Sequence, residues 1–361
     1  MPAVIQNDVP MRGKGVYGMN SGQQHSAMLN ALPLISNSVA ESWGKRSYAD
    51  RPFTIVEYGC SDGKNSVEPV AAALRPLLHA KCVQIFLNDR PENDFAATSK
   101  NVEKIEENGE KDGIRAFTAM VPKNFYKQVL PPNSADVGFS LMSVHYVNTL
   151  PPLRAGEGAL DASRRETKQE IWEKDFCSFL VLRASELVPG SSLVLSFLSN
   201  PPEGETNFEV VNESLRWAQQ EMIREDILSQ DFIRQFELPT HYPSPERVRE
   251  KVTSVGDWEI KDLFQQEIKH PAVQELKERR AKRDDAKDLE WYANTVIDWF
   301  MAVISGYFLK TLLITHGEKL DEEQRERVLE DWKVRSKKRF LAEHKDAKVS
   351  TWLVFVRLQK H

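Results

Sequence analysis

The residues best suited to bind a charged or polar ligand lie in one short stretch near residue 60. Glu57 ends an apolar run, and Gly59 and Gly63 follow it, four residues apart. Glycines in such a turn let a ligand approach the backbone, and the N–H groups at the start of the next helix favour a carboxylate or phosphate. An acid at the strand end suits a ligand ammonium or a sugar hydroxyl. The spacing is not that of the dinucleotide fingerprint, so a pyrophosphate is the less natural ligand, and a purely structural turn is the alternative.

A second acid is predicted to lie beside the first. The apolar run 82–87 ends in Asn88 and Asp89. In doubly wound α/β folds, an acid at the end of the second strand takes the ribose hydroxyls of a nucleoside. The two acids therefore predict a nucleotide-like ligand over the carboxyl ends of the first two strands.

Two further segments carry polar side chains that could reach the same ligand. The predicted strand 135–142 leads into His145 and Tyr146, at the carboxyl end where an open α/β sheet binds its ligands. A lone histidine is more often structural, but its place beside Tyr146 at a strand end favours a functional role. Residues 17–24 are rich in Tyr, Asn, Ser and Gln, which predicts a hydrogen-bonding lid. A frayed arm is the alternative.

Alternating strands and helices must position these groups, which predicts an α/β fold. The predicted strands are 53–57, 82–87, 115–121, 135–142, 192–198, 258–264 and 349–358. The predicted helices are 23–43, 67–74, 99–113, 168–187, 207–236, 246–255, 272–290, 295–314 and 321–344. The alternation breaks after residue 198, so the later part of the chain is expected to add a mostly helical cap to the sheet.

Composition excludes several classes of function. The chain has 361 residues, a formal net charge of −5 and a pI of about 6.0, so no basic surface indicates binding to nucleic acid or anionic lipid. Cys60, Cys82 and Cys177 lack the spacing of metal ligands. They predict a reduced, cytoplasmic protein without disulfides or a metal site. No apolar run approaches ~18 residues, so neither a signal peptide nor a membrane span is expected.

Six motifs, in the same order along the chain, resemble those of the SABATH family of S-adenosylmethionine-dependent methyltransferases. This family esterifies small carboxylic acids or methylates nitrogen atoms of purine alkaloids. The motifs cover most of the chain, and together they are specific although each alone is weak. They are Tyr17–Gln24, Glu57–Asn65, Asn88–Phe95, Val121–Tyr126, Ser143–Tyr146 and Tyr242–Val248.

The resemblance implies a Rossmann-like class I methyltransferase sheet with helices on both faces. Residues 1–50 would form an arm and helix that close over the site. Residues 51–200 and 346–361 would form the cofactor-binding core, and residues 201–345 a mostly helical substrate-binding cap with part of the core sheet. Family members are often dimers, so a homodimer is also expected from the resemblance.

The resemblance further implies S-adenosyl-L-methionine as cofactor and S-adenosyl-L-homocysteine as product. Glu57 and Asn65 would contact the methionine part, Asp89 the ribose hydroxyls, and Arg90 the adenine. The full set expected to hold the cofactor is Tyr17, Ser21, Glu57, Gly59, Cys60, Asn65, Asp89, Arg90, Asn124, Phe125 and Ser140.

By the same resemblance, Gln24 and Tyr146 would hold the carboxylate of a small acid, with His145 beside them as the third catalytic candidate. The remaining substrate-binding candidates are Val211, Asn212, Phe300 and Val303. Core packing is the alternative role for Phe300 and Val303. If Asn212 and Arg216 line the pocket, a polar or dicarboxylic acid is expected.

Three of these positions depart from the family pattern. Glu57 replaces an aspartate and keeps its charge. Arg90 replaces an apolar residue and can stack on adenine through its planar guanidinium. Tyr146 replaces a tryptophan, and a phenol both donates and accepts a hydrogen bond, whereas an indole only donates. The last change bears on the size and angle of the acid more than on the reaction.

The expected chemistry needs little from the protein beyond alignment. A carboxylic acid with a pKa near about 4 is ionised at neutral pH, so no general base is required, and His145 is an optional one. Gln24 and Tyr146 would orient one oxygen and leave the other to attack, in a site without water. The alternatives are N-methylation of a small heterocycle, a cofactor-binding regulator without turnover and, more distantly, a nicotinamide-dependent reductase.

Overall fold

A computed structural model describes residues 9, 18, 20–46, 51–77, 80, 82–283 and 285–361 of the chain. Its centre is a seven-stranded sheet in the order β3-β2-β1-β4-β5-β7-β6. The first five strands are parallel, and β7 pairs antiparallel with both β5 and β6. The strands are β1 (Phe53–Tyr58), β2 (Val83–Asp89), β3 (Ala116–Pro122), β4 (Ala135–Leu141), β5 (Leu187–Leu198), β6 (Trp258–Lys269) and β7 (Ser350–Lys360).

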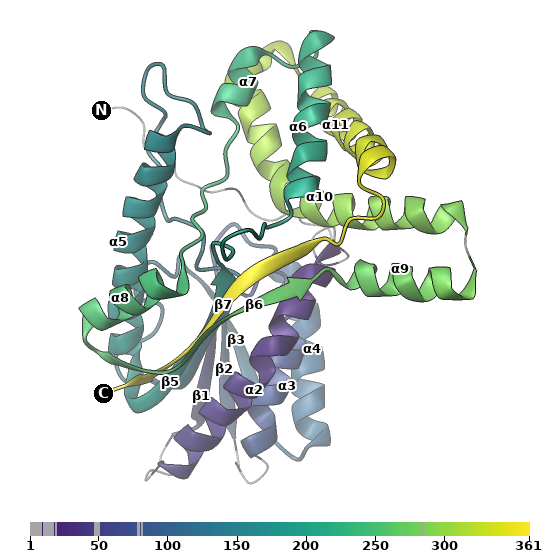
Figure 1. The fold of residues 1–361 in the computed structure, drawn as a ribbon. Coiled ribbons are helices and arrows are strands. Elements are labelled where there is room, and N and C mark those ends of the chain that lie inside the picture. Colours follow the sequence, from purple (N-terminus) through teal and green to yellow (C-terminus); the bar gives the residue numbers. More distant parts are fainter. Residues whose placement is uncertain are drawn as a thin grey trace.

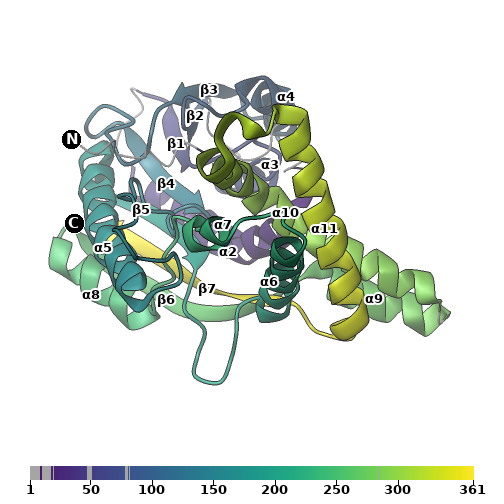
Figure 2. The ribbon, with the colours of Figure 1, turned by 90° about the horizontal axis from the view of Figure 1, so that it is seen from above.

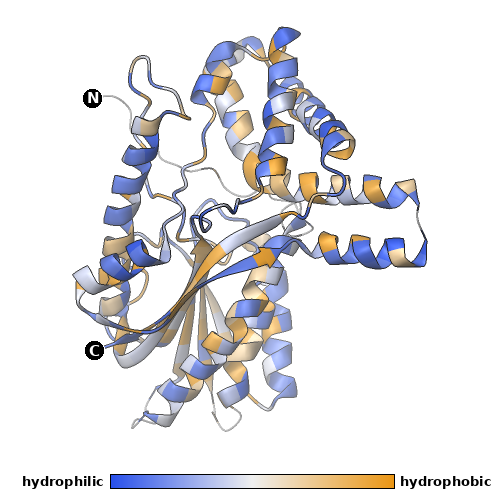
Figure 3. Cartoon of the chain, viewed as in Figure 1, coloured by the Kyte–Doolittle hydropathy of each residue, from blue (hydrophilic) through white to orange (hydrophobic). Residues whose placement is uncertain are grey.

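Helices cover both faces of the sheet (Figure 1). One face carries α2 (Gly22–Gly44), α3 (Val67–Leu74) and α4 (Phe95–Lys111), and the other carries α5 (Ala162–Glu186) and α8 (Pro245–Val255). Side chains alternate across a strand, so Ile55 packs into the core under α2 and α3 while Val56 packs into the core under α5. This burial on both faces explains the continuous apolar strands in the sequence. Figure 3 shows the strands as largely hydrophobic and the outer helix faces as hydrophilic. The predicted fold class is confirmed.

Most of the remaining helices form a layer over the carboxyl ends of the strands, while α9 (Pro271–Lys282) projects to one side (Figures 1 and 2). Aromatic contacts hold them together: Phe308 stacks on Trp332 with ring centroids 4.2 Å apart, and the Trp332 indole donates a 3.0 Å hydrogen bond to the carbonyl of Leu215. These three residues join α10, α11 and α6. The helices are α6 (Glu209–Arg224), α7 (Gln230–Gln235), α9 (Pro271–Lys282), α10 (Ala286–His316) and α11 (Glu322–Glu343).

Several predicted elements differ from the structure. The expected helix 207–236 is two helices, which span Glu209–Arg224 and Gln230–Gln235. Helix α5 begins at Ala162, inside the segment expected to be a loop, and β6 continues to Lys269. Pairing with β7 along its whole length keeps β6 extended, although polar residues interrupt its apolar pattern. The expected helix 272–290 is two helices, because Asp285 caps a new one by accepting a hydrogen bond from the amide of Lys287.

One helix departs from the expectation that no apolar run approaches the length of a membrane span. Helix α10 is long and apolar enough to span a membrane. However, 61% of its most apolar stretch is buried inside the protein, and a core helix passes the same test. In this structure α10 supplies aromatic side chains to the helical layer over the sheet.

We expect three histidines, of which His145 and His270 are buried and His241 is half-buried, to make the protein sensitive to acid. Burial lowers the pKa of His145 to about 3 and the pKa of His241 and His270 to about 4, whereas an unfolded histidine has a pKa near about 6.5. The unfolded chain therefore binds more protons between these values, and the stability present above pH ~6.5 is lost as the pH falls toward the folded pKa. Thermal unfolding followed by circular dichroism across this range measures the effect.

The variant His241→Gln removes one of these three proton-binding groups. Its unfolding free energy should depend less on pH than that of the unchanged protein, by up to about one proton between pH ~6.5 and ~4. Equal pH dependence in the two proteins would contradict the assignment.

Candidate functional site

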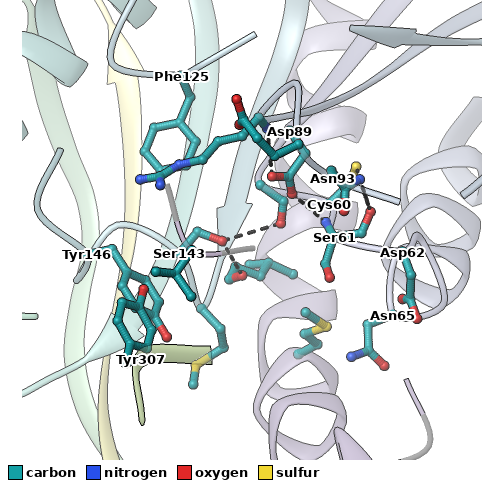
Figure 4. Close-up of a pocket in the computed structure, with 17 residues that line it drawn as sticks. Cys60, Ser61, Asp62, Asn65, Asp89, Asn93, Phe125, Ser143, Tyr146 and Tyr307 are labelled. Atoms are coloured by element: carbon teal, nitrogen blue, oxygen red, sulfur yellow. Dashed lines mark hydrogen bonds between the residues drawn. The ribbon is translucent and has the colours of Figure 1, made fainter. Parts of the chain in front are cut away.

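A cavity of about 890 Å³ opens over the carboxyl ends of β1, β2 and β4 (Figure 4). We call it the cofactor cavity. Its wall combines the glycine turn after β1, the segment after β2, Phe125 and the segment after β4, and Tyr307 of α10 adds a phenol from the helical layer. Figure 4 shows Tyr146 and Tyr307 side by side, and Asn65 lies across the cavity from them. The sequence-predicted residues in this wall are Gly59, Cys60, Asn65, Asp89, Arg90, Phe125 and Tyr146.

The amides of the glycine turn are largely used inside the protein. Those of Gly59 and Cys60 donate to the carbonyl of Asn88 at 2.8 and 3.0 Å, and that of Gly63 donates to the carbonyl of Cys60 at 3.0 Å. The expectation that this turn offers its N–H groups to a ligand anion is therefore wrong at these positions. A pyrophosphate would find few donors here, which speaks against a nicotinamide-dependent reductase. Gly59 is required because its φ is +89° and a Cβ would collide with the Ser143 side chain.

Asp89 is positioned to accept hydrogen bonds from the hydroxyl groups of a ligand. Its Oδ2 accepts a 2.6 Å hydrogen bond from the amide of Ser61, and its Oδ1 accepts a 2.7 Å bond from the amide of Arg90. Burial raises the pKa of this carboxyl group. Each oxygen of a carboxylate can accept a second hydrogen bond, so Asp89 is held rigidly and still offers acceptors to the cavity.

Glu57 is the most unusual charge at this site. Its side chain is buried, and Oε2 has no hydrogen-bond partner among the residues that the structure describes. Burial, with a contribution from the nearby Asp89, raises the pKa of Glu57 to about 7. An unsatisfied buried carboxylate oxygen is costly, and a ligand cation would satisfy it. The charged side chains of the cavity wall agree, since Asp62, Asp89 and Glu92 outnumber Arg90.

The N-terminal arm docks on the glycine turn. The Asn65 amide donates to the Ser21 hydroxyl at 3.1 Å, and the hydroxyl of Ser21 and the ammonium of Lys64 both donate to the carbonyl of Gly18. The described part of the arm therefore lies where a lid would start. Tyr17, the other predicted lid residue, lies outside the described residues.

A second cavity, of about 580 Å³, meets the first at the end of β4. We call it the acceptor cavity. Met142 and Tyr146 belong to the walls of both cavities. Among the described residues of its wall, His145 is the only ionisable group besides the tyrosines. The sequence-predicted substrate residues that the structure brings together here are Gln24, His145, Tyr146, Phe300 and Val303.

Backbone hydrogen bonds fix the segment that carries His145 and Tyr146. The amide of Val147 donates to the carbonyl of Pro239 at 2.8 Å, and the amide of His241 donates to the carbonyl of His145 at 2.9 Å. The Tyr126 hydroxyl donates to the Tyr146 carbonyl at 2.5 Å. These hydrogen bonds fix the end of β4 to the extended segment before α8. The phenol of Tyr146 is thereby held between the two cavities.

Gln24 is oriented by a residue that the sequence analysis did not select. The indole of Trp299 donates a 3.0 Å hydrogen bond to Oε1 of Gln24. An indole only donates, so the carbonyl end of the amide faces Trp299 and the NH₂ group points elsewhere. Among the residues that the structure describes, none accepts a hydrogen bond from this NH₂ group, and Gln24 lines the acceptor cavity. It is therefore available to a ligand oxygen.

His145 is a neutral group in this site. It is buried, its Nδ1 has no partner among the described residues, and burial lowers its pKa to about 3. An imidazole with so low a pKa binds a proton weakly at neutral pH. His145 can exchange a hydrogen bond with a ligand, but it is a poor general base.

Besides Ser21 and Glu57, four of the described sequence-predicted residues lie outside both walls. The Ser140 hydroxyl donates to the carbonyl of Tyr58 at 2.7 Å, and Asn124 is bonded to Tyr126 and Asn148. Both support the site from behind. Val211 is buried in the core, and Asn212 lines a separate, more distant cavity.

Besides Trp299, the sequence analysis missed the wall residues Met142, Tyr242 and Tyr307. Tyr242 begins one of the six family motifs, so the sequence carried a signal for it. Tyr307 lies in an apolar helix, where nothing in the sequence distinguishes it from a core residue.

The sheet order, the acidic cavity over β1 and β2, and the neutral cavity that joins it define an S-adenosylmethionine-dependent methyltransferase. The residues present fit that cofactor. Oε2 of Glu57, buried and without a partner among the described residues, suits its cationic group, and Asp89 suits its hydroxyl groups. The chain belongs to the family of SAM-dependent carboxyl methyltransferases, the SABATH family, whose model matches residues 7–342.

Relatives agree over nearly the whole chain. The protein is 36% identical to "Methyltransferase FUS9" of Gibberella moniliformis and 37% identical to "O-methyltransferase acrG" of Aspergillus aculeatus, in each case over 98% of both chains. It is also 26% identical to "Probable caffeine synthase 5" of Camellia sinensis, over 73% of this chain and 79% of that one. A solved structure, "Loganic acid methyltransferase with SAH", superposes with a TM-score of 0.73 at 19% identity, covering 97% of this chain and 98% of the other.

We expect cofactor affinity to rise with pH up to about 7. Because the pKa of Glu57 is raised to about 7, much of the free protein carries a proton there at neutral pH. A bound cation is stabilised by the ionised form of Glu57. Binding should therefore release a proton, and affinity should fall as the pH decreases below about 7. Isothermal titration calorimetry with S-adenosylhomocysteine, in buffers of different ionisation enthalpy, counts the proton.

The variant Glu57→Gln should bind more weakly and release no proton. The control Asp62→Asn changes another acid of the cavity wall, and it should keep the proton release. If Glu57→Gln still releases a proton when the ligand binds, that proton comes from another group.

We expect Trp299→Phe to lower kcat/KM for the methyl acceptor by about tenfold with little change in the Kd of the cofactor. The substitution keeps an aromatic ring and removes the donor that fixes the Gln24 amide. Trp291→Phe, on the same helix but without that hydrogen bond, is the matched control. Steady-state kinetics and cofactor titration measure both quantities, and equal kinetics in the two variants would contradict the role of Trp299.

Proposed function

We propose that the protein methylates a carboxyl group and converts a carboxylic acid to its methyl ester, with S-adenosylhomocysteine as the second product. The observation that carries this proposal is the chemistry of the acceptor cavity. Gln24 and Tyr146 provide neutral hydrogen-bond donors, while the one histidine in the wall has a pKa of about 3. Such a site can hold an anion that is already ionised, and it offers little help in removing a proton.

The reaction follows from orientation and exclusion of water. When bound, S-adenosylmethionine supplies a methyl group on a positively charged sulfur. A carboxylate with a pKa near about 4 is ionised at neutral pH. The NH₂ group of Gln24 and the phenol of Tyr146 bind one oxygen and direct the other toward the end of β4, where the two cavities join. The aromatic wall formed by Trp299, Phe300 and Tyr242 keeps the acid poorly solvated.

The cofactor-binding roles are part of the same proposal. Glu57 and Asn65 hold the amino-acid part, with Asn65 tied to the arm through Ser21. Asp89 accepts from the ribose hydroxyls. Arg90 and Phe125, both in the cavity wall, flank the adenine.

N-methylation of a heterocycle is the second candidate, because the relatives include a probable caffeine synthase. A purine N–H must lose its proton during methylation. Within the described wall of the acceptor cavity, neutral His145 is the nearest thing to a base, and its low pKa makes it a weak one. A carboxylic acid avoids this step, which is why we favour it.

Incubation with isotopically labelled S-adenosylmethionine and separate panels of carboxylic acids and xanthines tests the proposal. We expect methyl esters, which mild alkali hydrolyses, whereas N-methyl products survive. Tyr146→Phe should reduce kcat/KM by about 10-fold to 100-fold, the range for loss of a hydrogen bond to a charged group. Tyr307→Phe, in the wall of the cofactor cavity but not in that of the acceptor cavity, is the control. Alkali-stable products from the xanthine panel alone would overturn the proposal.

A further inference from the structure

A third cavity, of about 1110 Å³, lies directly behind the acceptor cavity. We call it the distal chamber. Six residues belong to the walls of both, so the two spaces are neighbours across a shared aromatic boundary. At this boundary Phe208 packs against Phe300 and Tyr242, with ring centroids 5.1 and 6.4 Å away. The shared residues are Phe208, Leu238, Thr240, Tyr242, Phe300 and Ile304.

The distal chamber is larger than the acceptor cavity in front of it. An acid the size of a single aromatic ring, held at Gln24 and Tyr146, would leave this chamber unfilled. Apolar side chains from the helical layer, among them Leu215, Ile233, Phe236 and Trp332, form much of its wall. This surface suits an extended hydrocarbon chain.

One polar group in the chamber lacks a partner. Gln219 of α6 is 4% exposed and lines the chamber, and its Nε2 has no hydrogen-bond partner among the described residues. An unsatisfied buried donor costs roughly 1–3 kcal/mol. Asn212, Arg216 and Gln219 are spaced four and three residues apart, so they share one face of α6. That face presents polar groups to the chamber beyond its apolar wall.

The cations of the chamber wall are already paired. Arg216 bonds to Glu209, and Lys168 lies 3.1 Å from a carboxylate oxygen of Glu237. The unsatisfied group is a neutral amide that can only donate at Nε2. A second carboxylate here would stay charged after the reaction and would find no unpaired cation in the described wall, so the wall favours an uncharged oxygen, such as a carbonyl or hydroxyl.

We propose that the acceptor is an elongated acid with a polar far end. Its carboxylate lies at Gln24 and Tyr146, its apolar chain passes Phe208, and a neutral oxygen accepts a hydrogen bond from Gln219. This inference rests on the proposed carboxyl methylation. It gives Asn212 a place beside the far end of the substrate, away from the reacting group, and it makes a dicarboxylic acid the less suited substrate.

Two series of acids test the length and the polar end. Unbranched acids of about 6 to 16 carbons, each with and without a terminal hydroxyl group, are compared with benzoate as methyl acceptors. We expect kcat/KM to rise with chain length, and the hydroxylated acid to be favoured by about tenfold at the length that reaches Gln219.

Two variants locate these effects. Ile233→Trp fills the distal chamber, and it should reduce turnover of long acids at least tenfold while leaving benzoate unaffected. Gln219→Met removes the donor at similar volume, and it should abolish the preference for the hydroxylated acid. Gln220→Met, an exposed neighbour in the same wall, should keep that preference. Thermal unfolding and titration with S-adenosylhomocysteine confirm that each variant is folded.

The outcomes separate the inference from the function on which it rests. Methylation of short acids without any gain from length, and without an effect of Ile233→Trp, would overturn the elongated substrate alone. Equal hydroxyl preference in Gln219→Met and the unchanged protein would overturn the role of Gln219. If no acid of any length is esterified while the cofactor product still binds, the proposed function fails, and the inference fails with it.

Discussion

The parallel pairing of β1 with β2 on one side and β4 on the other is the constraint on which the site depends. In this register Tyr58 lies beside Asn88, and Glu57 lies beside Phe139. Three strands therefore end at one edge of the sheet, about 4.8 Å apart. The glycine turn, Asp89 and the segment carrying Tyr146 leave from these ends, so groups distant in sequence reach one ligand. Asn88 strengthens the arrangement, because its carbonyl accepts two amides of the turn.

The two joined cavities provide different electrostatic environments. The cofactor cavity has an excess of acids in its wall, and beneath it lies Glu57, whose buried Oε2 has no partner in the described part of the chain. The acceptor cavity offers neutral donors and aromatic surface. In the proposed reaction an anion and a cation meet where these environments join, and both charges disappear. Because charges interact more strongly where water is scarce, a neutral, poorly hydrated wall favours that neutralisation.

Much of the fold and part of the site could be predicted because the signals are local. Glu57, Asp89 and Tyr146 each follow an apolar strand, and parallel topology brings strand ends together. The pairing of Gln24 with Trp299 spans 275 positions, and no periodic pattern reports it. The amides of the glycine turn seemed available because their acceptor, the carbonyl of Asn88, belongs to another strand. The distal chamber depends on how α6, α7, α10 and α11 pack, which composition does not specify.

The place of β7 has a consequence for the order in which the molecule can be completed during synthesis. This strand is the last in sequence, yet it fills the gap between β5 and β6 and is the partner along the whole length of β6. Strands β1 to β5 can pair while the ribosome is still translating, so the nucleoside side of the site can form early. Thr351, in the wall of the acceptor cavity, arrives only with the final strand. A nascent chain would thus hold an exposed edge at β5, open to wrong pairing, until residues 350–360 emerge.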